Sequence, residues 1–135
     1  MTTWLIAYAA AGLAFLVLDV IWLGIAAPRV YRPALGSLLA ERINVAAAGA
    51  FYVIYVGGIV ALAVSPAIAA KSFATCTIMG AILGLTAYGT YNLTNLATLR
   101  GWPPTLVMVD MAWGTLATSA TSAAAYLAVV RAIAH

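Results

Sequence analysis

Apolar residues run through this chain in four long stretches that polar residues hardly interrupt. Each stretch is close to the roughly 20 residues that an α-helix needs to cross a membrane. Apolar and polar positions show little alternation with a period of two, which argues against strands. The pattern therefore predicts four membrane-spanning helices, over residues 3–27, 44–65, 72–97 and 105–132.

Proline positions support these boundaries. All five prolines lie between the apolar stretches rather than within them. Proline breaks helix interiors because it lacks an N–H and its ring clashes with the preceding turn. We therefore expect each span to begin or end near a proline. The prolines are Pro28, Pro33, Pro66, Pro103 and Pro104.

The first connection, residues 28–43, is the long one. It combines charged residues with three leucines that give it an apolar side, which is typical of a short helix lying in the membrane interface. The other two connections are tight, and short loops make consecutive helices antiparallel neighbours. We therefore expect an all-α fold: an antiparallel bundle of four transmembrane helices with a short interfacial helix between the first and the second. The charged residues are Arg29, Arg32, Glu41 and Arg42.

Composition agrees with lipid as the main solvent. Of the 135 residues, 66% are hydrophobic and only 7% are charged, whereas soluble domains contain about 25% charged residues. Too few polar groups are present to cover a water-soluble surface. The length fits one integral membrane domain over residues 1–135. Because the first apolar stretch is longer than a signal-peptide core, we expect it to be retained as a span.

Few side chains could support metal or redox chemistry. Cys76 is the only cysteine, so an intrachain disulfide is impossible, and His135 is the only histidine. No serine or cysteine stands beside a base, and no phosphate-binding glycine loop is present. We therefore expect no cofactor, no metal site and no catalytic residue. The scattered basic residues argue against a nucleic-acid partner.

The basic residues indicate an orientation. Four arginines fall on one side of the predicted bundle, and two basic side chains fall on the other with the N-terminus. Because Lys and Arg are enriched in cytoplasmic loops, we expect the arginine-rich side to be cytoplasmic and both termini to be outside. The four arginines are Arg29, Arg32, Arg42 and Arg100, and the other two residues are Lys71 and Arg131.

Each span contains a pair of notable residues three positions apart. The outer two spans have Asp-x-x-Trp and the inner two have Tyr-x-x-Tyr. With a rise of 1.5 Å per residue, the first residue of each pair lies about 8 to 13 Å from the arginine-rich side, although helix direction alternates. The third span adds two asparagines on the same stripe. The set is Asp19, Trp22, Tyr52, Tyr55, Tyr88, Tyr91, Asn92, Asn95, Asp110 and Trp113.

These residues predict a polar, acidic chamber inside one half of the membrane. A carboxylate at the centre of a spanning helix costs about 2.5–3.5 kcal/mol on insertion scales, so Asp19 and Asp110 must be paired, hydrogen-bonded or neutral. Charged and amide groups should therefore face the bundle interior. Gly80 and Gly84, four residues apart, would allow close contact with another helix.

Three functions remain open from these residues. The chamber could bind or transport a small amphipathic or lipid-like molecule, and transport by so small a bundle would need a homodimer. Alternatively, the polar cluster only fixes helix packing in a structural or accessory membrane protein. The third hypothesis is a small lipid-modifying enzyme with an Asp as general acid or base. It ranks last because nothing beyond the buried carboxylates points to it.

The motifs together resemble an uncharacterised bacterial family of small predicted inner-membrane proteins, a domain-of-unknown-function family. The resemblance covers nearly the whole chain and implies a four-helix, multi-pass protein of the bacterial inner membrane, with periplasmic termini for the orientation above. It implies no activity, ligand or catalytic residue. The motifs are Asp19-x-x-Trp22-Leu23, Tyr31-x-x-x-Leu35-Gly36, Tyr52-x-x-Tyr55-x-x-Gly58, residues 88–95 with Ala97-Thr98-Leu99, Trp102, and Asp110-x-x-Trp113-Gly114.

Overall fold

A computed structural model gives the fold, and it describes residues 1–134. His135 lies outside the described residues. The chain forms four helical runs and, within residues 1–134, no strand. The first run comprises α1 (Thr2–Ala26), a π turn η1 (Ala27–Tyr31), the short helix α2 (Arg32–Leu35) and a 3₁₀ turn η2 (Gly36–Leu38).

The other three runs are also long. The second comprises α3 (Val45–Ile59), a π turn η3 (Val60–Val64) and α4 (Ser65–Ala70). The third is α5 (Phe73–Thr98) and the fourth is α6 (Pro104–Ile133). All four runs are long and apolar enough to cross a membrane. The prediction of an all-α protein with four candidate spans is therefore confirmed.

Side-chain caps explain where the second and third runs begin. The Asn44 side chain accepts a hydrogen bond from the Ala47 N–H at 3.0 Å, and the Ser72 hydroxyl accepts one from the Thr75 N–H at 3.1 Å. Such caps satisfy N–H groups that have no partner in the first turn of a helix. They fix these two starts close to the residues that the sequence predicted.

Three of the prolines lie inside helical runs, so the expectation that prolines end the spans was wrong for them. Pro28 and Pro33 belong to the run over residues 2–38, and Pro66 belongs to the run over residues 45–70. The second span therefore continues to Ala70 instead of ending at residue 65. Likewise, α2 follows α1 without a break rather than as a separate segment.

Two π turns explain why the helices tolerate Pro33 and Pro66. Each turn ends two residues before a proline, and each has an N–H that donates five residues back: Arg32 to the Ala27 carbonyl, and Ser65 to the Val60 carbonyl. A proline ring in a regular helix clashes with the carbonyl four residues earlier. The wider π turn moves that carbonyl aside, so the helix continues.

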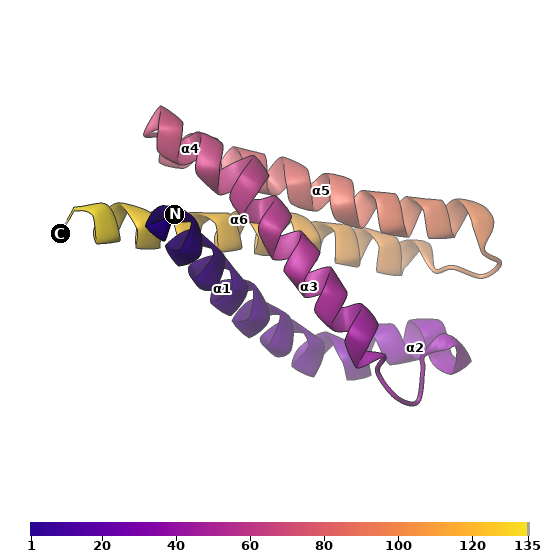
Figure 1. The fold of residues 1–135 in the computed structure, drawn as a ribbon. Coiled ribbons are helices and arrows are strands. Elements are labelled where there is room, and N and C mark those ends of the chain that lie inside the picture. The colour runs from indigo at the N-terminus through magenta and orange to yellow at the C-terminus, as the bar shows by residue number, and fades with distance from the viewer. Residues whose placement is uncertain (135) are drawn as a thin grey trace.

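The helices α5 and α6 form the most closely packed pair (Figure 1). Glycines make this possible. A Cβ added at Gly80 would lie 2.9 Å from the Ser122 Cβ, and one added at Gly84 would lie 2.9 Å from the Gly114 carbonyl carbon. A Cβ at Gly114 itself would overlap the ring of Tyr88. The contact that Gly80 and Gly84 predict is therefore present, and its partner is α6.

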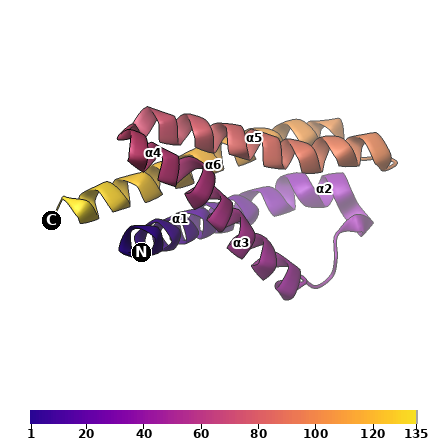
Figure 2. The same ribbon diagram turned by 45° about the horizontal axis from the view of Figure 1, so that its top comes forward.

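The second run crosses this pair at an angle. In both ribbon views α3 begins well apart from α5 and approaches it only toward α4 (Figures 1 and 2). The main apolar core accordingly lies where α1, the end of the second run, α5 and α6 meet, around buried residues such as Phe15, Ile59 and Val129.

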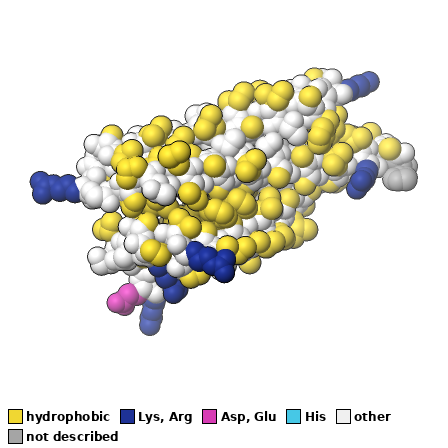
Figure 3. Space-filling view, turned by 180° about the vertical axis from the view of Figure 1, so that it is seen from behind, with side chains coloured by type: hydrophobic (Ala, Val, Ile, Leu, Met, Phe, Trp, Pro, Cys, Tyr) yellow, Lys and Arg dark blue, Asp and Glu magenta, His cyan; other side chains and the backbone are white. Residues whose placement is uncertain are grey.

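Charged side chains lie at the two ends of the molecule. Hydrophobic side chains cover the middle of the face shown in Figure 3, and Lys and Arg stand at both ends. Both termini lie at one end, and α2 with the α5–α6 loop lies at the other (Figure 1). We call the end with both termini, Lys71 and Arg131 the terminal end. We call the end with α2 and the α5–α6 loop the arginine-rich end. This is the surface of a protein that crosses an apolar layer.

Candidate functional site

Asp110, on the second turn of α6, is the centre of a hydrogen-bond network. Its side chain is only 6% exposed. One carboxylate oxygen accepts a hydrogen bond from the Tyr31 hydroxyl, and the other accepts one from the Asn92 amide at 2.6 Å. The Trp22 indole N–H donates to the Tyr31 hydroxyl at 3.1 Å. Groups from α1, η1, α5 and α6 therefore converge on one carboxylate.

Asn92 is held in a single orientation. It is fully buried, and its amide nitrogen donates both to Asp110 and to the Tyr88 carbonyl, at 3.0 Å. If the amide oxygen and nitrogen were exchanged, the oxygen would point at two other acceptors and could form a hydrogen bond with neither. The Asn92 amide oxygen remains buried with no hydrogen-bond partner within residues 1–134. A buried acceptor without a donor is costly and uncommon, so this atom is suited to an additional donor.

Asp19 has a separate partner. It is half-buried on α1, and one of its carboxylate oxygens accepts a hydrogen bond from the Tyr52 hydroxyl of α3. Phe15, one turn earlier on α1, packs against Tyr52 and Tyr55 with ring centroids 5.5 and 5.3 Å apart. The carboxylate therefore joins α1 to the part of α3 that diverges from the rest of the bundle.

The two Asp-x-x-Trp motifs meet through their tryptophans. Trp22 and Trp113 stack with ring centroids 4.5 Å apart and ring planes 5° from parallel. The Trp113 indole N–H is buried without a hydrogen-bond partner within residues 1–134. This stack places the indoles of α1 and α6 face to face, beside the two carboxylates that precede them by one turn.

The inner tyrosines lie between the polar centre and the core. The Tyr55 hydroxyl is 2.7 Å from the Thr118 hydroxyl, which donates to the Gly114 carbonyl at 2.6 Å. Tyr55 and Tyr88 pack edge-on with ring centroids 6.3 Å apart. Both rings line a cavity of about 450 Å³.

This space, which we call the chamber cavity, lies between α3, α5 and α6. Its lining residues are Phe51, Tyr55, Ala87, Tyr88, Tyr91 and Asp110. Two of them stand at its mouth, because Phe51 is 45% exposed and Tyr91 is 55% exposed on helices long enough to span a membrane. With a rise of 1.5 Å per residue, the lining residues lie about 9 to 17 Å from the nearer helix ends. The mouth therefore faces the apolar layer and not the water beyond the helix ends.

Two of the predicted chamber residues lie further from the carboxylates. Tyr91 borders the chamber cavity but turns outward and packs edge-on against Trp102, with centroids 5.8 Å apart. Asn95 is half-buried one turn beyond Tyr91 and hydrogen-bonds to neither Asp19 nor Asp110. The remaining predicted residues contact one of the carboxylates, the tryptophan stack or the chamber cavity.

Metal ligation has little support in this arrangement. Within residues 1–134, no group of three or more His, Cys, Asp or Glu side chains is close enough to hold a metal ion. The sole cysteine, Cys76, is buried in the terminal half, where its thiol donates to the Ser122 carbonyl at 3.2 Å. The candidate site is therefore one of carboxylates, phenols, amides and indoles.

Comparison with known families identifies the chain at the level of a family. The model described as "Predicted membrane protein (DUF2177)" matches residues 4–127. The chain belongs to this family. The match includes the whole network around Asp110, and the family is a membrane-protein domain of unknown function. No curated protein and no solved structure matches the chain. Membership therefore establishes a membrane protein with four candidate spans and assigns no activity.

Tyr31 is the main residue of the network that sequence reasoning did not include. We expected Pro28 to end the first span, which placed Tyr31 in an interfacial segment outside the chamber. Because the helix continues through η1, Tyr31 instead reaches back to Asp110. The available signal was its place in the Tyr31-x-x-x-Leu35-Gly36 motif.

Proposed function

We propose that this protein binds a small amphipathic molecule that enters the chamber cavity from the membrane. The observation that supports this best is the cavity itself, about 450 Å³, with aromatic walls and the Asp110 carboxylate among its lining residues. Ligand sites are typically apolar concavities with a few convergent polar groups. An apolar ligand body would pack against the aromatic rings, and its polar head would reach Asp110.

The chemistry of the lining favours a head group that donates hydrogen bonds. Asp110 offers a carboxylate, and it is the one acidic side chain among the lining residues. No arginine or lysine lines the cavity. An anionic head would therefore meet a carboxylate without a compensating cation, which is unfavourable at low dielectric. An amine or ammonium head fits best, and a hydroxyl fits second.

A series of probes with one tail and three heads tests this proposal. Dodecylamine, dodecanol and dodecanoate share an alkyl tail and differ in their heads. We expect the purified protein in detergent to bind dodecylamine most tightly and dodecanoate least, as measured by calorimetry. Asp110→Asn should abolish the preference for the amine over the alcohol. Equal binding of all three probes, or an unchanged preference in Asp110→Asn, would refute the proposal.

A matched pair of alanine substitutions locates the binding. Ala87 lines the chamber cavity, and Ala87→Leu would narrow it. Ala120 lines an apolar groove between α1 and α6, so Ala120→Leu adds the same side chain elsewhere in the bundle. We expect only Ala87→Leu to weaken dodecylamine binding, by about tenfold. Equal effects of the two variants would place the probe outside the chamber cavity.

A structural role is the second candidate, and one observation favours it. Both carboxylates already accept hydrogen bonds from tyrosines elsewhere in the chain: Asp19 from Tyr52 and Asp110 from Tyr31. Such bonds could fix helix register without any ligand. In that case the double variant Asp19→Asn/Asp110→Asn should lose thermal stability strongly. A double variant as stable as the wild type would contradict the structural role.

We further propose that the protein lies in a bacterial inner membrane with its arginine-rich end in the cytoplasm. The excess of arginines at that end supports this orientation. A periplasmic reporter fused after the last residue should then be active, because both termini share the opposite end. A reporter active only in the cytoplasm would reverse the orientation. Transport, as distinct from binding, would require a homodimer, which crosslinking in native membranes would detect.

A further inference from the structure

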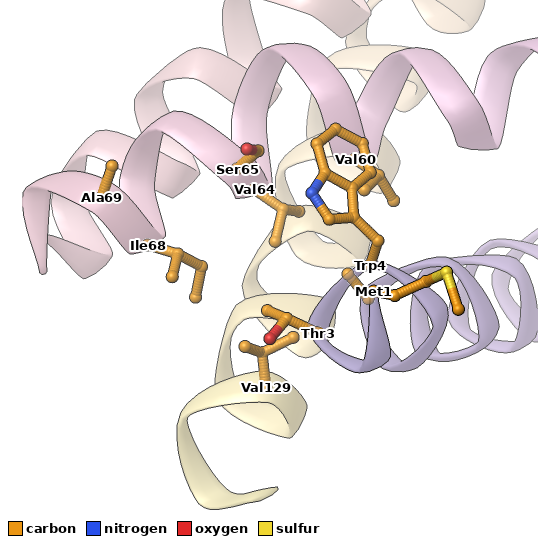
Figure 4. A pocket seen from close by; sticks show the side chains of 10 residues that line it. Met1, Thr3, Trp4, Val60, Val64, Ser65, Ile68, Ala69 and Val129 are labelled. Carbon is orange, nitrogen blue, oxygen red and sulfur yellow. The ribbon is translucent and has the colours of Figure 1, made fainter. Parts of the chain in front are cut away.

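A second cavity lies at the terminal end of the bundle, whereas the chamber cavity lies toward the arginine-rich end. Its volume is about 330 Å³, and it is enclosed by the start of α1, by η3 with α4, and by the end of α6 (Figure 4). We call it the terminal cavity. Its lining includes Thr3, Trp4, Val60, Ser65, Ala69 and Val129.

The terminal cavity extends along the membrane normal. Trp4 and Ala69 lie within one turn of the helix ends, and Val60 lies ten residues before the end of the second run at Ala70. With a rise of 1.5 Å per residue, the cavity reaches about 15 Å inward. That is half of the roughly 30 Å hydrocarbon core, and so about the depth of one leaflet. An extended alkyl chain from that leaflet matches this shape.

The mouth has the chemistry of a lipid head-group region. Trp4 is 51% exposed there, and tryptophan is enriched where apolar chains meet head groups. The hydroxyls of Thr3 and Ser65 line the same cavity. Neither makes a hydrogen bond within residues 1–134, whereas most hydroxyls on α5 bond back to their own helix. Both hydroxyls can therefore donate to an ester or phosphate oxygen.

Within residues 1–134, the charged side chains at this end are both basic. Lys71 directly follows α4, two residues after Ala69, and Arg131 lies two residues after Val129. The only acidic residues of the sequence are Asp19, Glu41 and Asp110, and all three lie toward the other end. A phosphate at this end of the bundle would therefore lie in the field of two basic side chains and of no acidic side chain, which favours an anionic head group.

We propose that the terminal cavity binds one anionic phospholipid. One acyl chain lies in the cavity against Trp4, Val60 and Val129, and the phosphate lies at its mouth near Lys71 and Arg131. The site is separate from the chamber cavity: the two share no lining residue, and their lining residues on α6, Val129 and Asp110, are nineteen residues apart, which is about 28 Å. It also differs in charge, because the chamber cavity is acidic.

Native mass spectrometry tests the charge preference. The purified protein is mixed with equal amounts of phosphatidylglycerol, which is anionic, and phosphatidylcholine, which is zwitterionic. We expect phosphatidylglycerol to be retained in excess. Lys71→Gln/Arg131→Gln should reduce that excess about tenfold, because each basic side chain near a membrane surface attracts anionic lipid. The control Arg29→Gln/Arg32→Gln removes the same charge at the other end and should leave the excess unchanged.

A cavity-filling variant tests where the chain lies. Ala69→Phe should reduce the retained lipid of both kinds, whereas Ala124→Leu, in the groove between α1 and α6, should not. Unchanged lipid retention in Ala69→Phe would overturn the proposal, and so would an undiminished excess in Lys71→Gln/Arg131→Gln. A dimer mass that Ala69→Phe abolishes would assign the cavity to a second copy of the chain and would equally overturn it.

Discussion

Tyr31 is the residue whose removal would report most directly on the polar network. Its hydroxyl accepts a hydrogen bond from the Trp22 indole and donates one to Asp110. Tyr31→Phe removes only the oxygen and keeps the ring, which packs against the small core formed by Trp102 and its neighbours at the start of α6. The substitution therefore removes two hydrogen bonds without opening a large cavity.

The expected loss can be worked out from these two bonds. Hydrogen bonds between membrane helices average about 0.6 kcal/mol, with a maximum near 1.7 kcal/mol. The Trp22 bond is neutral and half-buried, so it should contribute about the average. The bond to Asp110 involves a carboxylate that is 6% exposed, and bonds to charged groups are worth about 1.5–3 kcal/mol. The maximum measured between membrane helices limits this second bond to about 1.7 kcal/mol, so the sum is about 2 kcal/mol.

The control is another tyrosine with no such partners. Tyr126, on α6, is 8% exposed and its hydroxyl makes no hydrogen bond within residues 1–134. Tyr126→Phe should change stability by less than about 0.5 kcal/mol. Unfolding of the purified protein in mixed micelles with increasing dodecyl sulfate, followed by circular dichroism, measures both variants. If Tyr31→Phe is as stable as Tyr126→Phe, the Tyr31 hydroxyl does not hold the network together.

Three further outcomes follow from single contacts. Gly84→Ala should destabilise the protein by about 1–3 kcal/mol in the same unfolding assay, because its methyl group would overlap the backbone of α6. The control Gly58→Ala, where the added methyl group meets open space, should be neutral or stabilising. Equal effects of the two variants would contradict the packing argument. Tyr52→Phe should speed hydrogen exchange of α3 more than of α6, since the Tyr52 hydroxyl joins α3 to Asp19; a uniform change would contradict that local role. Cys76 is fully buried, so it should resist maleimide in micelles until dodecyl sulfate unfolds the protein, and prompt labelling would show that this core opens.

The number and type of helices could be predicted because they follow from the composition of long segments of the chain. Four apolar stretches and a charged fraction of 7% leave lipid as the only solvent for most of the surface. The burial of Asp110 and Asn92 follows from the same rule, since each would be costly against lipid. The pairing of Gly84 with another helix was likewise readable from its spacing, although not which helix it would contact.

The details that sequence reasoning missed depend on the backbone conformation of the turn before a proline. Proline predicts a break, and Pro66 does lack the N–H that a regular helix would use. The chain instead widens the preceding turn into a π turn, with the Ser65 N–H donating to Val60. This choice costs little where neighbouring helices pack against the turn, and Val60 and Val64 are both buried. Tertiary packing thus decides whether a helix continues past a proline, and the local sequence pattern does not predict that outcome.

Binding and stabilising roles for the network are physically compatible, and one variant separates them. Each carboxylate oxygen of Asp110 already accepts one hydrogen bond, yet a carboxylate can accept about four. A ligand can therefore reach Asp110 without displacing Tyr31. Ala87 borders the cavity and takes no part in the hydrogen-bond network. Ala87→Leu should consequently retain the wild-type free energy of unfolding within about 0.5 kcal/mol while it loses dodecylamine. A variant that keeps both its stability and its full affinity for the amine would leave the packing role as the explanation of the cluster.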